Sequence, residues 1–178
     1  LGYRPNRVAE ALRGGLGSVM GFVVPDISNP FFASLALEFE AAFAARGLVV
    51  MIGSVGNDPH AEWAFTAALV DWQATGAIFA GIQNESTIRL LDDSGMRYLC
   101  IDNGSVDPST PWIGIDNASE ARRAVAHLIG HGYRRIACLT GREGTLTADE
   151  RLRGYELALE AAGRPLLPEL VLRGDYSV

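Results

Sequence analysis

The sequence predicts an α/β protein whose core is a doubly wound parallel sheet. Short apolar runs recur along the chain, and most are separated by stretches with helical periodicity and capping residues. Strands that alternate with helices in this way form parallel sheets covered on both faces. The predicted strands are, in order, Val19–Val24, Leu48–Ile52, Ala77–Ala80, Tyr98–Ile101, Trp112–Ile115, Ile136–Leu139 and Leu170–Leu172.

Two of the predicted helices begin with a polar residue followed by proline. Asn29 precedes Pro30, and Asp58 precedes Pro59. The polar side chain accepts a hydrogen bond from the free N–H groups of the first turn, and proline suits the first helical position because it has no N–H to satisfy. Gly47 ends the first of these helices.

Two later helices are predicted from similar signals. Asp116 or Asn117 begins one of them. Thr147 and Glu150 have the spacing of a capping box, in which each side chain bonds to the backbone of the other residue. This capping box predicts the start of a helix that ends near Gly163.

Charge is unevenly distributed along the chain. The 178 residues are 48% hydrophobic, enough to fill a core, and carry a net charge of −6, which argues against a body that binds nucleic acid. The N-terminal segment differs, because Arg4, Arg7 and Arg13 are accompanied there by one acidic residue, Glu10. We therefore expect any contact with DNA at the N-terminus.

This basic segment is predicted to form one short helix. Asn6 is a good N-cap, residues 7–13 can form about two turns, and Gly14 ends the helix. A helix shorter than ~12 residues is marginal in water, so it needs a partner to fold against. Leu12 is apolar among the arginines, as in a wedge flanked by phosphate-binding groups. A frayed segment with a surface leucine is the alternative.

Several segments together resemble the lactose-repressor (LacI/GalR) family of bacterial transcription regulators. They occur in the family's order and cover essentially the whole chain: RPNRVAEAL, GFVVPDISNPFFASL, IGIDN, AVAHL and RLRGYELALEAAG. The resemblance implies a hinge helix followed by a periplasmic-binding-protein-like (type I) effector domain.

The resemblance also implies a division of the chain. Residues 1–17 would be the hinge helix and linker, residues 18–131 the N-terminal effector subdomain, and residues 132–178 the start of an incomplete C-terminal effector subdomain. We expect the parent protein to carry an N-terminal helix-turn-helix and the remainder of the second subdomain.

Polar side chains follow most of the predicted strands. Parallel sheets bind ligands beyond the carboxyl ends of their strands. Carboxylate and amide groups there can make paired hydrogen bonds to the vicinal hydroxyls of a sugar, and an aromatic ring can stack on its apolar face. The residues in this position are Asp26, Ser28, Asn57, Asp58, Gln83, Asn84, Asp102, Asn103 and Asp116, with Phe31 and Phe32 at the same edge.

We predict that six residues bind a small-molecule effector, a sugar. Asp26 is taken from its place after the first strand, and the resemblance implies the other five, which are Phe31, Phe32, Asp116, Thr147 and Arg151. Arg151 follows Thr147 by roughly one helical turn, so both can lie on one face.

Each of these residues has a purely structural alternative. The two aspartates and Thr147 can simply cap helices or turns, and Phe32 can belong wholly to the core. Arg151 can form a surface salt bridge, and its neighbour Arg153 can take its place, although the RLxGY pattern favours Arg151.

The resemblance implies a DNA-binding repressor that acts as a homodimer, whose two hinge helices enter the minor groove of operator DNA. Leu12 would unstack a base step, Ala9 would pack helix against helix, and Tyr3, Arg4 and Asn6 would contact phosphates. A sugar-binding receptor of a transport system, with the same fold and no DNA role, is the alternative.

Catalytic chemistry is not expected. No Gly-x-Gly-x-x-Gly or Gly-x-Ser-x-Gly motif is placed after a strand, and neither Cys100 nor Cys138 has an obvious catalytic histidine. His127 and His131 have metal-compatible spacing but no HExxH glutamate, so His131 is interpreted as a helix-end histidine. We expect no enzyme, no cofactor and no metal. No apolar run approaches the ~18 residues of a membrane span, and we expect a cytoplasmic protein.

Overall fold

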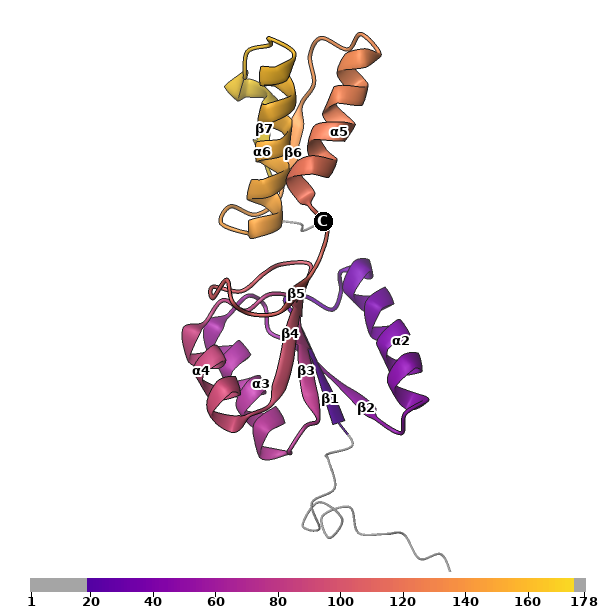
Figure 1. Ribbon diagram of the computed structural model, residues 1–178, viewed down its shortest axis with the longest axis vertical. Coiled ribbons are helices and arrows are strands. Elements are labelled where there is room, and N and C mark those ends of the chain that lie inside the picture. Colours follow the sequence, from indigo (N-terminus) through magenta and orange to yellow (C-terminus); the bar gives the residue numbers. More distant parts are fainter. Residues whose placement is uncertain (1–18, 175–178) are drawn as a thin grey trace, which may run out of the picture. The chain divides into compact units, whose positions relative to one another are not determined.

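The computed structural model describes residues 19–174 and divides the chain into two compact units between Ile113 and Gly114 (Figure 1). Both units combine helices with parallel strands. The residues predicted to contact DNA lie outside the described residues: Tyr3, Arg4, Asn6, Ala9 and Leu12.

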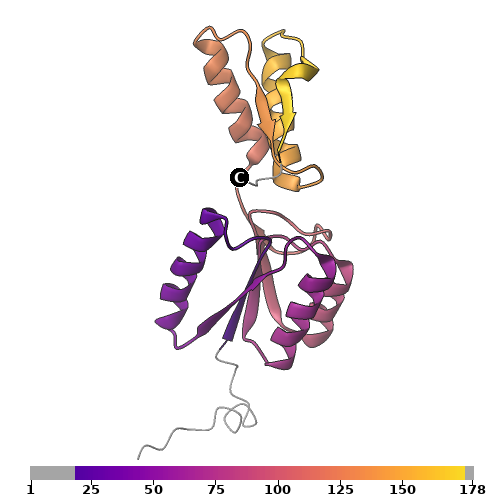
Figure 2. The ribbon, with the colours of Figure 1, turned by 180° about the vertical axis from the view of Figure 1, so that it is seen from behind.

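The first unit is a five-stranded parallel sheet with the strand order β2-β1-β3-β4-β5. Its strands are β1 (Val19–Val24), β2 (Val49–Ser54), β3 (Gly76–Phe79), β4 (Arg97–Ile101) and β5 (Trp112–Ile113). Helix α2 (Pro30–Ala44) covers one face of the sheet, and α3 (Pro59–Asp71) and α4 (Glu85–Ser94) cover the other (Figures 1 and 2). The prediction of a doubly wound parallel sheet is therefore confirmed.

Two apolar layers hold this sheet between its helices. Successive side chains of a strand point to opposite faces, so Phe22 packs with Phe32 of α2, whereas Val23 packs with Leu69 of α3. Phe22 also meets Phe39 edge-on, with ring centroids 5.0 Å apart. The sheet is thus buried on both faces, as its near-continuous apolar strands predict.

The second unit pairs two helices with two parallel strands. Its elements are α5 (Asn117–Gly130), β6 (Cys138–Thr140), α6 (Leu146–Ala161), the 3-10 helix η1 (Pro168–Leu170) and β7 (Val171–Arg173). Helix α5 packs along α6, and the strands lie beside α6 (Figure 2). Val125 of α5 and Tyr155 of α6 share the small core of this unit.

The compact units do not divide where the sequence predicts subdomains. Residue 131 follows α5, yet α5 belongs to the second unit because its buried Val125 packs against α6. The subdomain boundary at residue 131 rests on the family resemblance and stays a prediction.

Most of the predicted caps are confirmed. The side chain of Asn29 accepts from the Phe31 N–H at 3.0 Å, and that of Asp58 accepts from the His60 N–H at 2.9 Å. Asp116 caps α5, since its carboxylate accepts from the backbone of the first turn.

The predicted capping box of α6 is wrong. The helix begins at Leu146 after the N-cap Thr145, so Thr147 lies within the first turn and not before it. The Glu150 carboxylate instead accepts a hydrogen bond from Asn117 of α5. A contact between two helices therefore takes the side chain that the local pattern assigned to a cap.

Candidate functional site

The strand order places a topological switch point between β1 and β3. Strand β2 lies on one side of β1, while β3, β4 and β5 follow on the other, so the connections leave the carboxyl ends of β1 and β3 in opposite directions. Open parallel sheets form ligand crevices at such points. A small hollow of about 10 Å³ lies there, lined by Val23, Val24, Pro25, Val55, Asn57, Glu62, Ala80, Gly81 and Gln83.

Asp26 follows β1 at this edge of the sheet. Its two carboxylate oxygens accept from the hydroxyl and the backbone N–H of Ser28, both at 2.8 Å. These bonds, the hydroxyl first, hold the pKa of the Asp26 carboxyl below its usual range. Asp26 is exposed and fixed in one orientation by its own turn, so it offers acceptor oxygens to a ligand.

Phe31 and Phe32 begin α2 at the same edge and lie in different environments. Phe32 is 4% exposed and packs in the core, whereas Phe31 is 50% exposed. Their rings meet edge-on, with centroids 5.1 Å apart. The buried ring of Phe32 therefore packs against the ring of Phe31, and Phe31 presents an apolar face to solvent.

Glu62 on α3 is a buried residue that the sequence did not single out. It is 4% exposed, and its Oε2 accepts from the Gln83 N–H at 3.0 Å. Burial raises the pKa of this carboxyl, while the Gln83 N–H and the Thr87 hydroxyl act in the opposite direction. Glu62 thus ties α3 to the loop between β3 and α4. Glu62, Thr66 and Leu69 lie on one face of α3 and all three are buried, but two of them are polar, so no apolar stripe marked this face in the sequence.

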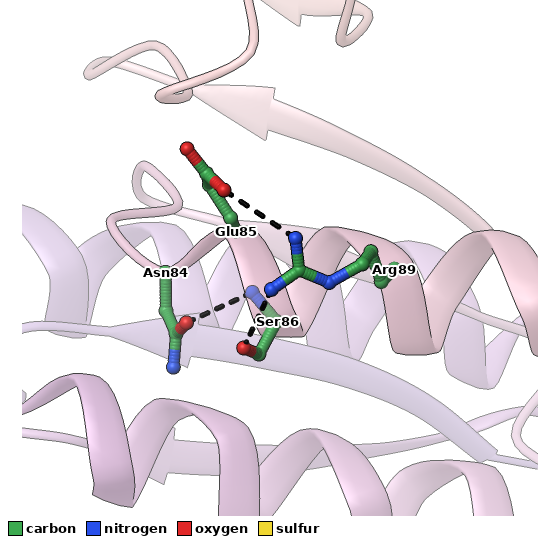
Figure 3. Close-up of polar contacts among 4 residues, drawn as sticks. All are labelled: Asn84, Glu85, Ser86 and Arg89. Carbon is green, nitrogen blue, oxygen red and sulfur yellow. Dashed lines mark hydrogen bonds and ion pairs between the residues drawn. The ribbon is translucent and has the colours of Figure 1, made fainter.

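Asn84 joins the N-termini of α3 and α4. Its Oδ1 accepts from the Ser86 N–H at 2.9 Å (Figure 3), and its Nδ2 donates to the Pro59 carbonyl oxygen at 2.9 Å. Beside it, Arg89 donates to Ser86 Oγ at 3.1 Å and pairs with Glu85 at 3.4 Å. The Arg89–Glu85 pair is exposed and adds little stability, so the Asn84 amide is what fixes this loop.

In the second unit, Asn117 is the centre of a polar network. It is 2% exposed, and its Oδ1 accepts from Arg151 Nε at 2.9 Å. Its Nδ2 donates to Glu150 Oε2 at 3.2 Å and to the Ile115 carbonyl oxygen at 3.3 Å. Asp116, the residue before it, caps the helix through the Ser119 N–H. The first turn of α5 is therefore held to α6 through Asn117, which bonds to the negative Glu150 and to the positive Arg151.

Three residues of the RLRGY segment have structural roles in the second unit. Arg151 makes the bond to Asn117. A Cβ on Gly154 would clash with the Ala118 carbonyl oxygen, so only glycine allows α6 to approach α5 this closely. The buried Tyr155 hydroxyl donates to the Ile136 carbonyl oxygen at 2.9 Å.

The six predicted effector residues fall into two groups of three. Asp26, Phe31 and Phe32 lie together at the carboxyl edge of the first unit. Asp116, Thr147 and Arg151 lie near the start of α5 and α6 in the second unit. Asp116 and Arg151 are exposed, whereas Thr147 is 3% exposed. Their role in ligand binding stays a prediction.

The two cysteines are free thiols in environments that disfavour thiolate chemistry. Burial raises the pKa of Cys100 to about 12, and the Glu62 carboxylate adds to the shift. Burial also raises the pKa of Cys138. Within residues 19–174, no helix has the length and apolar character that crossing a membrane requires. The same residues contain no group of three or more His, Cys, Asp or Glu side chains placed to hold a metal ion.

A doubly wound parallel sheet with ligand-type side chains at its switch point defines a periplasmic-binding-protein-like ligand-binding fold. The chain belongs to the family described as periplasmic binding proteins and sugar binding domain of the LacI family, which matches residues 17–178.

Individual relatives agree with this assignment. The chain is 31% identical to the HTH-type transcriptional regulator DegA of Bacillus subtilis, over 100% of this chain and 54% of that protein. It is 32% identical to the maltose regulon regulatory protein MalI of Escherichia coli, over 97% and 51%. The Cra transcriptional dual regulator of Pseudomonas putida, solved with fructose 1-phosphate, has the same fold, with a TM-score of 0.76 at 22% identity over 89% of this chain and 58% of that one. The chain spans about half the length of the curated relatives it matches.

Proposed function

We propose that this chain is the effector-binding part of a cytoplasmic transcription regulator that represses its target genes and senses a sugar. The observation that carries the proposal is that the exposed Phe31 ring and the oriented carboxylate of Asp26 both follow β1 at the carboxyl edge of a parallel sheet. A sugar offers both C–H faces for stacking and hydroxyl groups that donate to a carboxylate.

The first unit would supply stacking and acceptor groups. Phe31 would lie against an apolar ring face, with Phe32 holding it in place from the core. The Asp26 carboxylate would accept from two hydroxyl groups, since its turn with Ser28 fixes its orientation without covering it.

The second unit would supply a cation and further acceptors. The Arg151 side chain donates from Nε to Asn117, which orients the guanidinium and leaves its terminal nitrogens at the exposed end. The exposed Asp116 carboxylate would accept hydrogen bonds from the ligand. Thr147, which is buried, would be a further ligand-binding residue.

The N-terminal segment would contact operator DNA. In this proposal Leu12 unstacks a base step, Ala9 packs against its counterpart in a second copy, and Tyr3, Arg4 and Asn6 bind phosphates. The named roles of DegA and MalI as regulators support a DNA-binding function. We propose no catalytic activity and no cofactor.

The same proposal includes a homodimer formed through α2 and β2. Helix α2 exposes one large aliphatic side chain, Leu37, which is 67% exposed. Strand β2 is an edge strand and exposes Val49 at 54% and Ile52 at 37%. A second copy would cover this apolar surface and pair two hinge segments on one operator.

Operator binding by the full-length protein tests the regulatory part of the proposal. Leu12→Ala is expected to weaken operator binding in a gel-shift titration while sugar affinity is unchanged, because the wedge contacts only DNA. Val106→Ala, at an exposed loop position, is the control. Operator binding by the Leu12→Ala protein that equals that of the wild type would contradict the proposed role of Leu12 as a wedge. Sugar binding without sequence-selective DNA binding would favour a transport receptor instead.

A further inference from the structure

The last turn of α5 carries two histidines that lie side by side. His127 and His131 are separated by four positions, so their side chains leave the same face of the helix. Their ring centroids are 4.2 Å apart and the ring planes are tilted by 44°. Both side chains are exposed. Two imidazoles at this separation can reach a common ion from neighbouring turns.

A backbone contact fixes the tautomer of one ring. His131 Nδ1 lies 2.9 Å from the carbonyl oxygen of His127. A carbonyl oxygen can only accept, so Nδ1 carries the hydrogen and donates it. The lone pair of the neutral ring is then on Nε2, directed away from the backbone. Histidines that bind metals commonly have this arrangement, with one nitrogen donating to a carbonyl group and the other free for the ion.

The helix itself favours a cation at this position. α5 ends at Gly130 with His131 as its C-cap, so the pair lies beside the carbonyl groups of the last turn. Their partial negative charge stabilises positive charge nearby. This helix-end effect accounts for His131 alone, whereas a chelating pair also requires the neighbouring ring of His127 and the free Nε2 of His131.

We propose that His127 and His131 form a binding site for a divalent transition-metal ion such as Ni²⁺, Cu²⁺ or Zn²⁺. The ion would be bound by Nε2 of His131 and a ring nitrogen of His127, and imidazole is a preferred ligand of these three metals. Because the described residues supply no third ligand to a cluster here, water would complete the coordination. The site is thus an exchangeable surface site on α5, independent of the sugar-binding proposal.

The chain provides a matched control, because it contains three histidines and the third, His60, is on α3 in the first unit. Untagged protein is titrated with NiCl₂ by isothermal titration calorimetry. We expect one ion per chain for the wild type and for His60→Ala. We expect at least about a tenfold loss of affinity for His127→Ala and for His131→Ala, since even outer-shell partners of a metal ligand contribute 10–100-fold.

A second measurement needs no variant. Addition of substoichiometric Cu²⁺ is expected to broaden the ring NMR signals of His127 and His131 before those of His60. Absence of stoichiometric nickel binding, equal affinity in the His127→Ala protein, or copper broadening that begins at His60 would each overturn the proposal. Circular dichroism in EDTA checks that the exposed alanine variants remain folded.

Discussion

Arg151 Nε donates to Asn117 Oδ1 over 2.9 Å, and this bond joins the second turn of α6 to the first turn of α5. Asn117 is 2% exposed, while Arg151 is at the surface. One end of the contact is thus part of the interior, and the other end is available to a ligand. The contact gives Arg151 a structural and a proposed binding role at once, and the two can be separated by experiment.

Replacing Arg151 is expected to affect both roles. Arg151→Ala leaves the buried Oδ1 of Asn117 without this donor, which costs about 1–3 kcal/mol of unfolding free energy. It also removes a charged donor from the effector site, so we expect a sugar affinity at least about tenfold lower. Urea unfolding and calorimetry on the same samples measure the two effects. Arg153→Ala, two positions along α6, is the matched control. An equal loss of sugar affinity in that variant would contradict a specific role of Arg151 in binding.

Gly154, the glycine of α6, is predicted to be sensitive to substitution. In the Gly154→Ala variant the new methyl group would meet the Ala118 carbonyl oxygen, so α5 and α6 must separate. Overpacking of this kind costs about 1–3 kcal/mol or more, and chemical denaturation measures it. Gly130→Ala is the control, because no atom lies within 4 Å of a Cβ placed there. Comparable stability of the two variants would show that the helices are not in close contact at Gly154.

Glu62 is predicted to make stability depend on pH. Its pKa is raised in the folded state by burial, so the folded chain binds the proton more tightly than the unfolded chain. The favourable contribution is complete below the ordinary glutamate value of 4.5 and is lost as the pH rises through the higher folded-state value.

Glu62→Gln keeps an acceptor for the Gln83 N–H and removes the titration. The unfolding free energy of the wild type, measured relative to this variant, should therefore fall as the pH is raised from 4 to 8. A difference that is constant, or that grows with pH, would contradict a raised pKa.

Phe31 is predicted to contribute to sugar affinity and little to stability. Its ring is 50% exposed, so Phe31→Ala removes a stacking surface and leaves the core intact. We expect at least about a tenfold loss of sugar affinity by calorimetry, corresponding to 1.4 kcal/mol. Trp72→Ala is the control. It removes an exposed aromatic ring, 58% exposed, at the C-terminal end of α3. A similar loss in both variants would point to a general effect of the substitutions.

The apolar surface of α2 is predicted to hold the dimer together. Leu37→Glu places a charge in the centre of that surface and should convert the dimer to a monomer in analytical ultracentrifugation. Val106→Glu, at an exposed loop position, should leave the dimer unchanged. A monomeric wild type, or a Leu37→Glu dimer of unchanged affinity, would exclude this surface as the interface.

The strands and most helix starts follow from the sequence because they depend on local signals. Val19–Val24 is a fully apolar run buried on both faces, and Asn29 and Asp58 each cap a proline-led helix. Such features need only neighbouring residues. The parallel arrangement of the sheet then follows from the alternation of strands and helices, because strands joined through helices run parallel.

Contacts between distant segments could not be read in the same way. Glu150 was expected to cap α6 and instead bonds to Asn117, which lies 33 positions earlier. Glu62 was overlooked because a glutamate near a helix start is ordinarily exposed, and its burial depends on the Gln83 N–H of the next loop. The RLRGY segment was recognised by its resemblance, but the need for Gly154 became evident only with the position of Ala118.

Thermal unfolding of the full-length protein with a panel of mono- and disaccharides tests the sensing function most directly. A sugar that binds only the folded protein must raise its melting temperature. We predict that one class of sugar does so, and that Phe31→Ala and Arg151→Ala each remove most of the shift. No shift in melting temperature with any sugar, or a full shift retained in both variants, would contradict sugar binding by Phe31 and Arg151.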